Sequence, residues 1–374
     1  MKIFVSAGDP SGDLHGSNLI KEIKNQNPVV EVFGFGGSNM AASAVIFDKI
    51  ADKSIIGFWE PVKNIPRLNS NLSIAKNFFK KDKPDVFVPI DYYGFNIHLV
   101  REAHKQNIPV IYFISPQVWA TRKGRINELK KYIKKMLVIY PFEKDVYKKE
   151  GVDCEFVGNP LLDVIKKIPT SKTINYKTIG IMPGSRIQEI KNHFPFFIKA
   201  FNIISKEFKD AKVIVPVFSE EIKEYIRENF ILDFGKLEFI KYNNYEKRAE
   251  MDICITSSGT ATVENMILGI PMVIVYKTSF ITYNIAKLLI NVSYIGMVNI
   301  LAGKMVCPEL IQNKANPVNI AKECLRILNN KTAYQNMKNE LEETKRLLGS
   351  SGATERAAKI ILEAVNRKQN TVNS

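Results

Sequence analysis

The first 24 residues, MKIFVSAGDPSGDLHGSNLIKEIK (residues 1–24), decide the fold class. An uninterrupted apolar run, residues 3–7, leads into a turn of small residues and then into an amphipathic stretch, residues 13–24, with helical spacing. A continuous apolar run is typical of a strand that is buried on both faces of a parallel sheet. The stretch therefore predicts a strand, a tight turn and a helix, which form the repeating unit of a doubly wound α/β fold.

The same unit repeats through the first half of the chain. Helical patterns, for example at residues 97–105 and 122–134, alternate with short apolar runs. The expected strands lie at residues 3–7, 29–33, 86–90, 110–114, 136–139 and 155–157. This alternation predicts a parallel sheet with helices on its faces.

A polar segment, IPTSKTINYK at residues 168–177, is expected to link this half to a second one, in which the pattern restarts. The second half has expected strands at 178–182, 212–217, 237–240, 253–256 and 272–275, and expected helices at 186–208, 260–268 and 281–289. The tail, residues 316–368, has helical patterns only.

The expected architecture is α/β, with two facing Rossmann-like domains that each contain a parallel sheet, and a helical C-terminal tail. The boundaries are residues 1–168 for the first domain and 169–345 for the second. Residues 346–374 are expected to form a helix that packs back across the first domain. In such a fold a ligand binds at the carboxyl ends of the strands.

The composition is that of a globular protein with a large basic surplus. Hydrophobic residues at 45% and charged residues at 24% exclude a disordered or collagen-like chain. The net charge of +15 favours nucleic acid, phosphorylated substrates or an acidic membrane as partner, and it equally fits a solvated basic surface. The scattered cysteines are typical of reduced thiols in a cytoplasmic protein: Cys154, Cys254, Cys307 and Cys324.

The turn after the first strand, SAGDPSGDLHG at residues 6–16, combines small residues with Asp9. Ser11 and Gly12 open the predicted helix, where backbone N–H groups can meet an anionic or sugar group. Because Gly8 and Gly12 are four residues apart, the turn does not match a dinucleotide-binding fingerprint. A purely structural tight turn is the alternative.

A carboxylate follows another predicted strand in the segment IDYYGFN at residues 90–96. Asp91 comes directly after the apolar run, at the position where a doubly wound fold places catalytic groups. The alternative for Asp91 is a helix N-cap.

Two turns of the second half are suited to a diphosphate. In MPGSR (residues 182–186), Gly184 and Ser185 leave backbone donors available, and Arg186 supplies a guanidinium fork. The second turn, TSSGTATVE at residues 256–264, has the same strand–turn–helix shape. Its expected contacts are the N–H and O–H groups of Ser258, Gly259, Thr260 and Ala261 for the diphosphate, and Glu264 for the ribose. The pair of turns predicts a nucleotide diphosphate site.

Several other chemistries lack their motifs. The sequence contains no P-loop, no DxD metal clamp and no HExxH pair, and its four histidines have no ligand spacing. We therefore expect neither a bound metal nor a separate cofactor.

Two segments favour a membrane surface. SIIGFWEPVKNIPRL (residues 54–68) carries an apolar group formed by Ile55, Ile56, Phe58 and Trp59, and RKGRINELKKYIKK (residues 122–135) is strongly basic around Lys130. Together they could insert an apolar loop while basic side chains hold anionic headgroups. Ordinary packing and a solvated basic helix are the alternatives.

The chain resembles the lipid-A-disaccharide synthases, which are glycosyltransferases of the two-domain GT-B type. The matching motifs occur in order along nearly the whole chain: SGDLHG (11–16), PQVWA (116–120), PFE (141–143), FVGNPLLD (156–163), PGSR (183–186), SSGTATVE (257–264), PMVIVYK (271–277), TYNIAK (282–287) and NILAGKMVCPELIQ (299–312).

The resemblance implies a reaction and a location. A 2,3-diacylglucosamine unit would pass with inversion from UDP to the 6-hydroxyl of 2,3-diacylglucosamine 1-phosphate. The products would be UDP and the β(1→6) tetraacyl disaccharide 1-phosphate of lipid A biosynthesis. The resemblance also implies a peripheral enzyme on the inner face of the inner membrane, without a nucleic-acid partner.

The resemblance also implies residue roles. Asp91 matches an essential carboxylate, Arg186 an essential arginine and Asn299 a required asparagine, while Asp9 is the second candidate for the base. Ser11, Gly12 and Asn96 are expected to bind the acceptor. Two alternatives stay open: another GT-B enzyme, such as a UDP-sugar epimerase or a different lipid glycosyltransferase, and a non-catalytic basic protein that binds membrane or nucleic acid.

Overall fold

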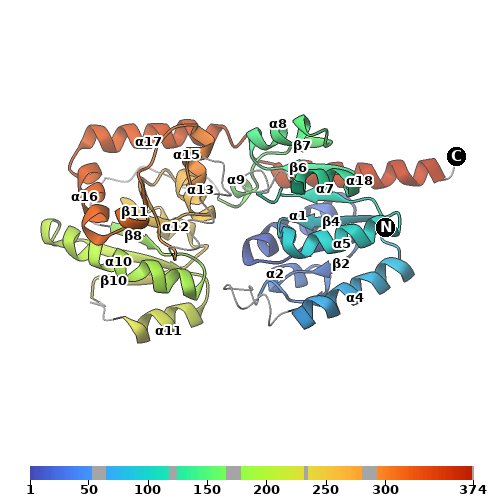
Figure 1. The fold of residues 1–374 in the computed structure, drawn as a ribbon, viewed down its shortest axis with the longest axis horizontal. Helices are drawn as coiled ribbons and strands as arrows, with labels where there is room; N and C mark the ends of the chain where they lie inside the picture. Colours follow the sequence, from blue (N-terminus) through green and yellow to red (C-terminus); the bar gives the residue numbers. More distant parts are fainter. Residues whose placement is uncertain (53–64, 118–123, 166–177, 231–234, 280–292, 373–374) are drawn as a thin grey trace. The chain divides into compact units, whose positions relative to one another are not determined.

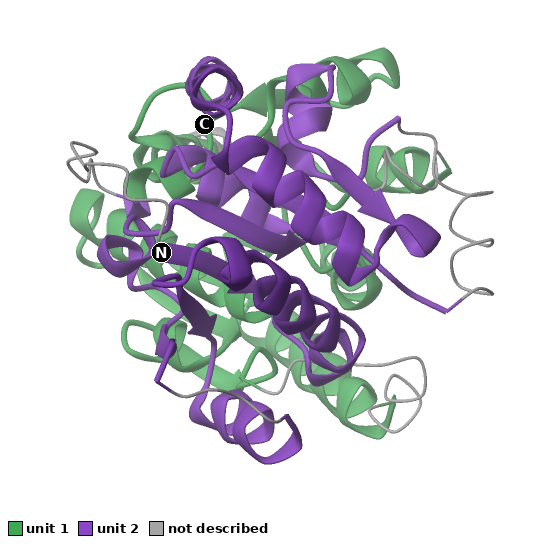
Figure 2. Ribbon diagram, turned by 90° about the vertical axis from the view of Figure 1, so that its left-hand side faces the viewer, with its two compact units in different colours: residues 1–163, 348–374 green, residues 164–347 purple. Residues whose placement is uncertain are grey.

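The computed structural model describes residues 1–52, 65–117, 124–165, 178–230, 235–279 and 293–372. The chain divides into two compact units, residues 1–163 with 348–374, and residues 164–347 (Figure 2). Each unit contains one sheet in which all paired strands are parallel, with helices packed on it (Figure 1). The predicted class, α/β with two Rossmann-like domains, is confirmed.

The first unit has the strand order β3-β2-β1-β4-β5-β6-β7. Its strands are β1 (Lys2–Ala7), β2 (Glu31–Phe35), β3 (Val45–Asp48), β4 (Val86–Ile90), β5 (Ile111–Phe113), β6 (Lys135–Val138) and β7 (Cys154–Phe156). Its helices are α1 (Pro10–Gln26), α2 (Ser38–Ala41), α4 (Ile65–Lys81), α5 (Tyr93–Lys105), α7 (Gly124–Tyr132), α8 (Pro141–Lys149) and α18 (Ala353–Val372). The short helix α9 (Leu161–Val164) lies at the boundary with the second unit.

The core of this unit explains why its strands are continuous apolar runs. Every residue of β4 is buried, because helices cover both faces of the sheet. Phe4 lies at the centre of a group of aromatic rings and packs edge-to-face against Phe35, Phe79 and Phe87. These contacts fix β1 and β4 beside each other, and the candidate site is built at their carboxyl ends.

The C-terminal helix α18 belongs to the first unit and packs along α1 (Figure 1). The Asp163 carboxylate accepts hydrogen bonds from Gly352 and Thr354 at the start of α18. The Arg356 guanidinium donates to the carbonyl oxygens of Val157 and Ser350. The end of the chain is therefore held to the turn after β7.

The second unit has the strand order β10-β9-β8-β11-β12-β13. Its strands are β8 (Thr178–Met182), β9 (Lys212–Val217), β10 (Leu237–Lys241), β11 (Ile253–Ser257), β12 (Met272–Tyr276) and β13 (Glu309–Ile311). Its helices are α10 (Ile187–Glu207), α11 (Glu220–Asn229), α12 (Tyr245–Arg248), α13 (Thr260–Ile267), α15 (Met297–Ala302), α16 (Pro317–Leu328) and α17 (Lys331–Arg346), with a 3₁₀ turn at Gln312–Lys314.

The strands expected at 86–90, 178–182 and 212–217 form with those bounds. The strand expected at 29–33 begins and ends two residues later, and the edge strands β3 and β13 were not expected. The linker expected at 168–177 and the helix expected at 281–289 lie outside the described residues.

In the part of the chain that is described, no helix is both long and apolar enough to cross a membrane.

Candidate active site

Asp9 and Asp91 follow neighbouring strands of the first unit. Ala7, the last residue of β1, pairs with Ile90, the last residue of β4, so the two turns begin side by side. Asp9 caps α1, and its Oδ1 accepts a hydrogen bond of 2.6 Å from the Gly12 N–H. The structure therefore brings the two predicted carboxylates to the same edge of the sheet.

The backbone at Asp91 has an unusual conformation. Asp91 and Tyr92 have φ angles of +42° and +47°, so two successive residues other than glycine are left-handed. Such residues cost about 1–3 kcal/mol each and cluster at functional sites. The Asp91 N–H donates to the Ile114 carbonyl at 3.1 Å, so the turn is also tied to the chain that follows β5.

The surroundings of Asp91 favour its protonated form. Burial and the nearby Asp9 carboxylate raise the pKa of Asp91 to about 7, against a smaller opposing effect of the Tyr92 N–H. A carboxylate with a pKa near 7 is suited to general-base catalysis at neutral pH, because it is ionised and still basic.

The three residues expected to bind the acceptor have different surroundings. Ser11 is partly buried in the first turn of α1, and the Gly12 N–H is already bonded to Asp9. Asn96 is fully buried; its Oδ1 accepts from Ser6, and its Nδ2 donates to the Asp91 carbonyl at 2.9 Å. Acceptor binding by Asn96 stays a prediction; in this structure its side chain points inward and holds the Asp91 turn.

The two predicted diphosphate turns lie next to each other in the second unit. Met182, at the end of β8, pairs with Thr256 of β11, so the segments that follow them leave the same edge of the sheet. The sequence prediction that both turns serve one site is compatible with this register.

The first turn is closed by a carboxylate. Gly184 has a φ of +128°, and the Ser185 N–H donates to Glu189 at 2.9 Å. The Arg186 side chain is 51% exposed and lies 3.7 Å from the other Glu189 oxygen. Its guanidinium is thus held at the start of α10 and reachable from solvent.

The second turn is open around its glycine. Gly259 has a φ of +140°, and the space where a side chain would project is empty. Gly259 and Thr260 are exposed, Ala261 is partly buried, and the three residues begin α13. First-turn N–H groups of a helix have no intrahelical acceptor, so this end of α13 can receive an anion. The Ser258 hydroxyl donates to the Ile295 carbonyl at 2.8 Å.

Glu264 belongs to a buried polar network. Its carboxylate accepts hydrogen bonds from the hydroxyls of Tyr242 and Tyr245, and it pairs with the fully buried Arg248 at 3.0 Å. The Arg248 guanidinium also donates to Asn265 at 2.9 Å. Contact between Glu264 and a ribose stays a prediction, and the structure gives the side chain an internal role.

The catalytic role expected of Asn299 stays a prediction, and the structure gives its side chain an internal, positioning role. It is fully buried, and its Nδ2 donates to Glu309 and to the Cys307 carbonyl, while its Oδ1 accepts from the N–H groups of Val306 and Cys307. These contacts use both N–H groups and both lone pairs of the side-chain amide. Glu309 in turn accepts from the Ile295 N–H, beside the contact of Ser258.

Sequence reasoning missed two features of this edge. His193 accepts from the Lys277 N–H and therefore donates through Nδ1 to the Pro183 carbonyl at 2.9 Å, which fixes the first turn. Phe218, 39% exposed, stacks on Tyr242 with ring centroids 3.6 Å apart. For the second feature the available signal was an aromatic residue directly after each of two expected strands, Phe218 after β9 and Tyr242 after β10.

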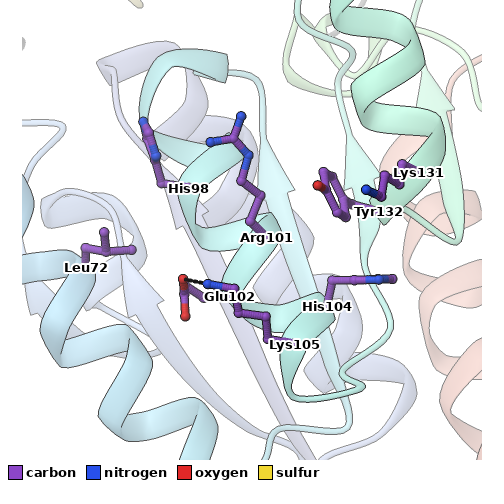
Figure 3. Close-up of a pocket in the computed structure, with 8 residues that line it drawn as sticks. All are labelled: Leu72, His98, Arg101, Glu102, His104, Lys105, Lys131 and Tyr132. Atoms are coloured by element: carbon purple, nitrogen blue, oxygen red, sulfur yellow. Dashed lines mark hydrogen bonds and ion pairs between the residues drawn. The ribbon is translucent and has the colours of Figure 1, made fainter.

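A cavity of about 420 Å³ on the first unit is lined by basic side chains of α5 and α7 (Figure 3). Arg101 is paired with Glu128, and Lys105 with Glu102. The cavity reaches the last turn of α5, whose first turn follows Asp91, so its far end is roughly 18 Å from the catalytic edge at 1.5 Å per residue. None of the predicted site residues lines it.

The predicted membrane residues are only partly described. Ile55, Ile56, Phe58 and Trp59 lie outside the described residues. Lys130 and Lys131 are exposed in the last turn of α7, and Lys134 is exposed just beyond it.

Two parallel-sheet Rossmann-like units, with paired polar turns at strand ends, define the chain as a protein of the GT-B type. Solved structures with this fold include a UDP-N-acetylglucosamine 2-epimerase (TM-score 0.64, 15% identity, 98% of this chain and 97% of that one). They also include a UDP co-structure of S. aureus MnaA (TM-score 0.68, 12% identity, 98% and 97%). At these identities the likeness shows the fold alone.

The family follows from the sequence matches. The family model described as lipid-A-disaccharide synthetase matches residues 3–365. The lipid-A-disaccharide synthase of Syntrophus aciditrophicus (strain SB) is 36% identical over 98% of this chain and 98% of its own length. The chain belongs to the lipid-A-disaccharide synthetase family.

Proposed function

We propose that this chain transfers 2,3-diacylglucosamine from UDP to the 6-hydroxyl of 2,3-diacylglucosamine 1-phosphate. The products are UDP and the β(1→6)-linked tetraacyl disaccharide 1-phosphate. The observation that carries the proposal is the family match over residues 3–365, which makes the chain a UDP-sugar hexosyltransferase. The alternatives of an epimerase or a non-catalytic binding protein are not favoured, because the likeness to epimerases is one of fold alone.

The donor nucleotide is assigned to the second unit. The open start of α13 at Gly259 and Thr260 and the exposed Arg186 guanidinium suit the diphosphate, because both supply donors to phosphate oxygens. The exposed Phe218 ring, stacked on Tyr242 at the same sheet edge, suits a pyrimidine base. The fold shared with a UDP-bound protein supports this assignment.

The base is assigned to Asp91 of the first unit, with Asp9 as the second candidate. The acceptor hydroxyl attacks the anomeric carbon of the donor sugar while Asp91 takes its proton, and the bond from that carbon to the UDP oxygen breaks. One C–O bond forms as another breaks, and attack from the opposite face inverts the anomeric centre. Arg186 and the N–H groups at the start of α13 balance the charge that develops on UDP.

A membrane-bound acceptor calls for a peripheral location, which we assign to the inner face of the inner membrane. Lys130, Lys131 and Lys134 present exposed positive charge on one stretch of the first unit. Lys135 does not belong to this surface, because it is partly buried and paired with Glu155 at 2.9 Å. Such exposed lysines contribute about 1 kcal/mol each near an anionic membrane.

The proposal is tested by incubating the purified chain with the two acylated sugars and analysing the products by mass spectrometry. We expect equal amounts of UDP and tetraacyl disaccharide 1-phosphate. Omitting the acceptor is the control, and it should stop UDP release. An epimerised UDP-sugar, or no product with both substrates present, would contradict the proposal.

A further inference from the structure

The Asp91 turn depends on the buried side chains of Tyr112 and Asn96. Tyr112 of β5 donates its hydroxyl to the Asp91 carbonyl at 2.5 Å, and Asn96 of α5 donates its amide to the same oxygen at 2.9 Å. A carbonyl oxygen has two lone pairs, so this one is fully satisfied by side chains from two different elements. We propose that Tyr112 is a positioning residue for the catalytic step, which holds the Asp91 turn, together with Asn96, in the conformation that the reaction needs.

This inference rests on the proposed role of Asp91 as the base, and the strain in the turn supports it. Left-handed φ angles at both Asp91 and Tyr92 persist only where the surroundings enforce them. The Tyr112 hydroxyl is one of those enforcing contacts. It is buried between the sheet and α5, so water cannot take its place without a local rearrangement.

The position of Tyr92, the second residue of the turn, is limited by the turn that follows the neighbouring strand β1. The Tyr92 ring lies over Gly8: a Cβ atom at Gly8 would fall 2.0 Å from the ring carbon Cδ1. Only a residue without a side chain allows this approach. Gly8 therefore fixes where Tyr92 can lie, while Tyr112 and Asn96 fix the carbonyl of Asp91.

The position of the Asp91 turn also affects the pKa of the Asp91 carboxylate. Among the described residues, Asp91 interacts electrostatically with Asp9 before α1, Tyr112 in β5, Tyr140 after β6 and Tyr147 in α8. Burial is the largest cause of the raised pKa of Asp91. A turn released from its carbonyl contacts exposes the carboxylate to water, and the pKa of Asp91 then falls toward its ordinary value of 3.8.

The test compares two tyrosine variants from the same core. Tyr112→Phe removes the hydroxyl that contacts Asp91. Tyr147→Phe is the matched control, because its hydroxyl is also buried but bonds to Ser115 and the Pro116 carbonyl. We measure the pH profile of kcat, the KM for the UDP-sugar and the melting temperature of each variant.

For Tyr112→Phe we expect the acidic limb of kcat to move from about pH 7 toward lower pH by at least about half a unit. We also expect the plateau of kcat to fall roughly 3- to 10-fold, the loss of one hydrogen bond, with an unchanged KM for the UDP-sugar. Tyr147→Phe should keep the wild-type limb. Asn96→Ser should shift the limb in the same direction as Tyr112→Phe.

An acidic limb of Tyr112→Phe that coincides with the wild type would overturn the inference, as would equal shifts in both tyrosine variants. Failure of the proposed function can be distinguished from failure of this inference, because the wild-type chain would then make no disaccharide at all. If the melting temperature of Tyr112→Phe is too low for the assay, the pH profile of Asn96→Ser is used instead. An acidic limb of kcat in Asn96→Ser that coincides with the wild type also overturns the inference.

Discussion

At the scale of single residues, the raised pKa of Asp91, the proposed base, also makes the free energy of unfolding depend on pH. The folded chain keeps the Asp91 proton up to about pH 7, whereas the unfolded chain loses it near 3.8. The stability that the protonated form provides is therefore present below pH 3.8 and is lost as the pH rises through 7. Asp91→Asn should raise the free energy of unfolding at pH 8 by a few kcal/mol and change it little near pH 4. Urea unfolding at the two pH values checks this, and equal effects at both would contradict it.

A second prediction concerns the buried pair of Arg248 and Glu264. Glu264→Gln leaves the guanidinium buried without its counter-charge, so we expect a loss of about 3–5 kcal/mol in the free energy of unfolding. Glu246→Gln, at an exposed position of α12, is the control and should be nearly neutral. Urea unfolding of both variants is the measurement. A loss below about 1 kcal/mol for Glu264→Gln would show that the pair is not isolated from water.

Also at the scale of single residues, the sequence predicted where polar residues lie along the chain but not which of their side chains are buried. The places of Asp91, directly after β4, and of Arg186, in the turn after β8, could be predicted from the apolar runs before them, and their catalytic roles stay predictions. The burial of Asn96 and Asn299 could not be predicted, because a sequence does not show whether a polar side chain turns outward or into the protein. Their hydrogen bonds come from residues on other elements, up to 90 positions away in the case of Ser6 and Asn96.

At the scale of elements, the strands that were predicted well are those buried on both faces. β4, β8 and β9 read as uninterrupted apolar runs, so their bounds follow from the sequence. β3 and β13 lie at sheet edges, and they were missed. The four residues of β3 alternate between exposed and partly buried, and β13 has three residues, which gives no continuous apolar signal.

The turn before α13 supplies a prediction at this scale. Gly259→Ala places a side chain in empty space but at a φ of +140°, so the backbone of the turn must shift. We expect UDP affinity to fall roughly 5- to 150-fold, the equivalent of about 1–3 kcal/mol of strain. The control is Gly269→Ala after the other end of α13, where φ is +66° and space is also open. Calorimetric titration with UDP is the measurement, and equal affinities for the two variants would count against the diphosphate turn.

At the scale of the whole molecule, the donor and the base are assigned to different units. UDP at about 100 times its dissociation constant should therefore stabilise the second unit by about 2.7 kcal/mol. We expect slower hydrogen exchange in β8, β11 and the start of α13, and little change in β1 or β4. Uridine, which lacks the diphosphate, is the control and should protect less. Protection confined to the first unit would contradict the assignment.

Two sheets in one chain could be predicted because the polar stretch at residues 168–177 interrupts the strand–turn–helix pattern, which restarts at 178. A C-terminal helix on the first domain was expected from residue 346, but the hydrogen bonds that hold it there are not visible in the sequence. α17 and α18 have similar amphipathic patterns, yet α17 packs in the second unit and α18 in the first. Their separation depends on the Asp163 carboxylate, 189 residues before Gly352, which no local pattern shows.

The most direct test of the account is the turnover of Asp91→Asn, measured together with its affinity for UDP. General-base catalysis contributes about 10²–10⁴-fold, so turnover should fall by that factor while the dissociation constant of UDP stays unchanged. Asp9→Asn, assayed in parallel, should retain more activity because Asp9 caps α1. Near-normal turnover of Asp91→Asn with an inactive Asp9→Asn would move the base to Asp9, and full activity in both variants would contradict a carboxylate base at this edge of the sheet.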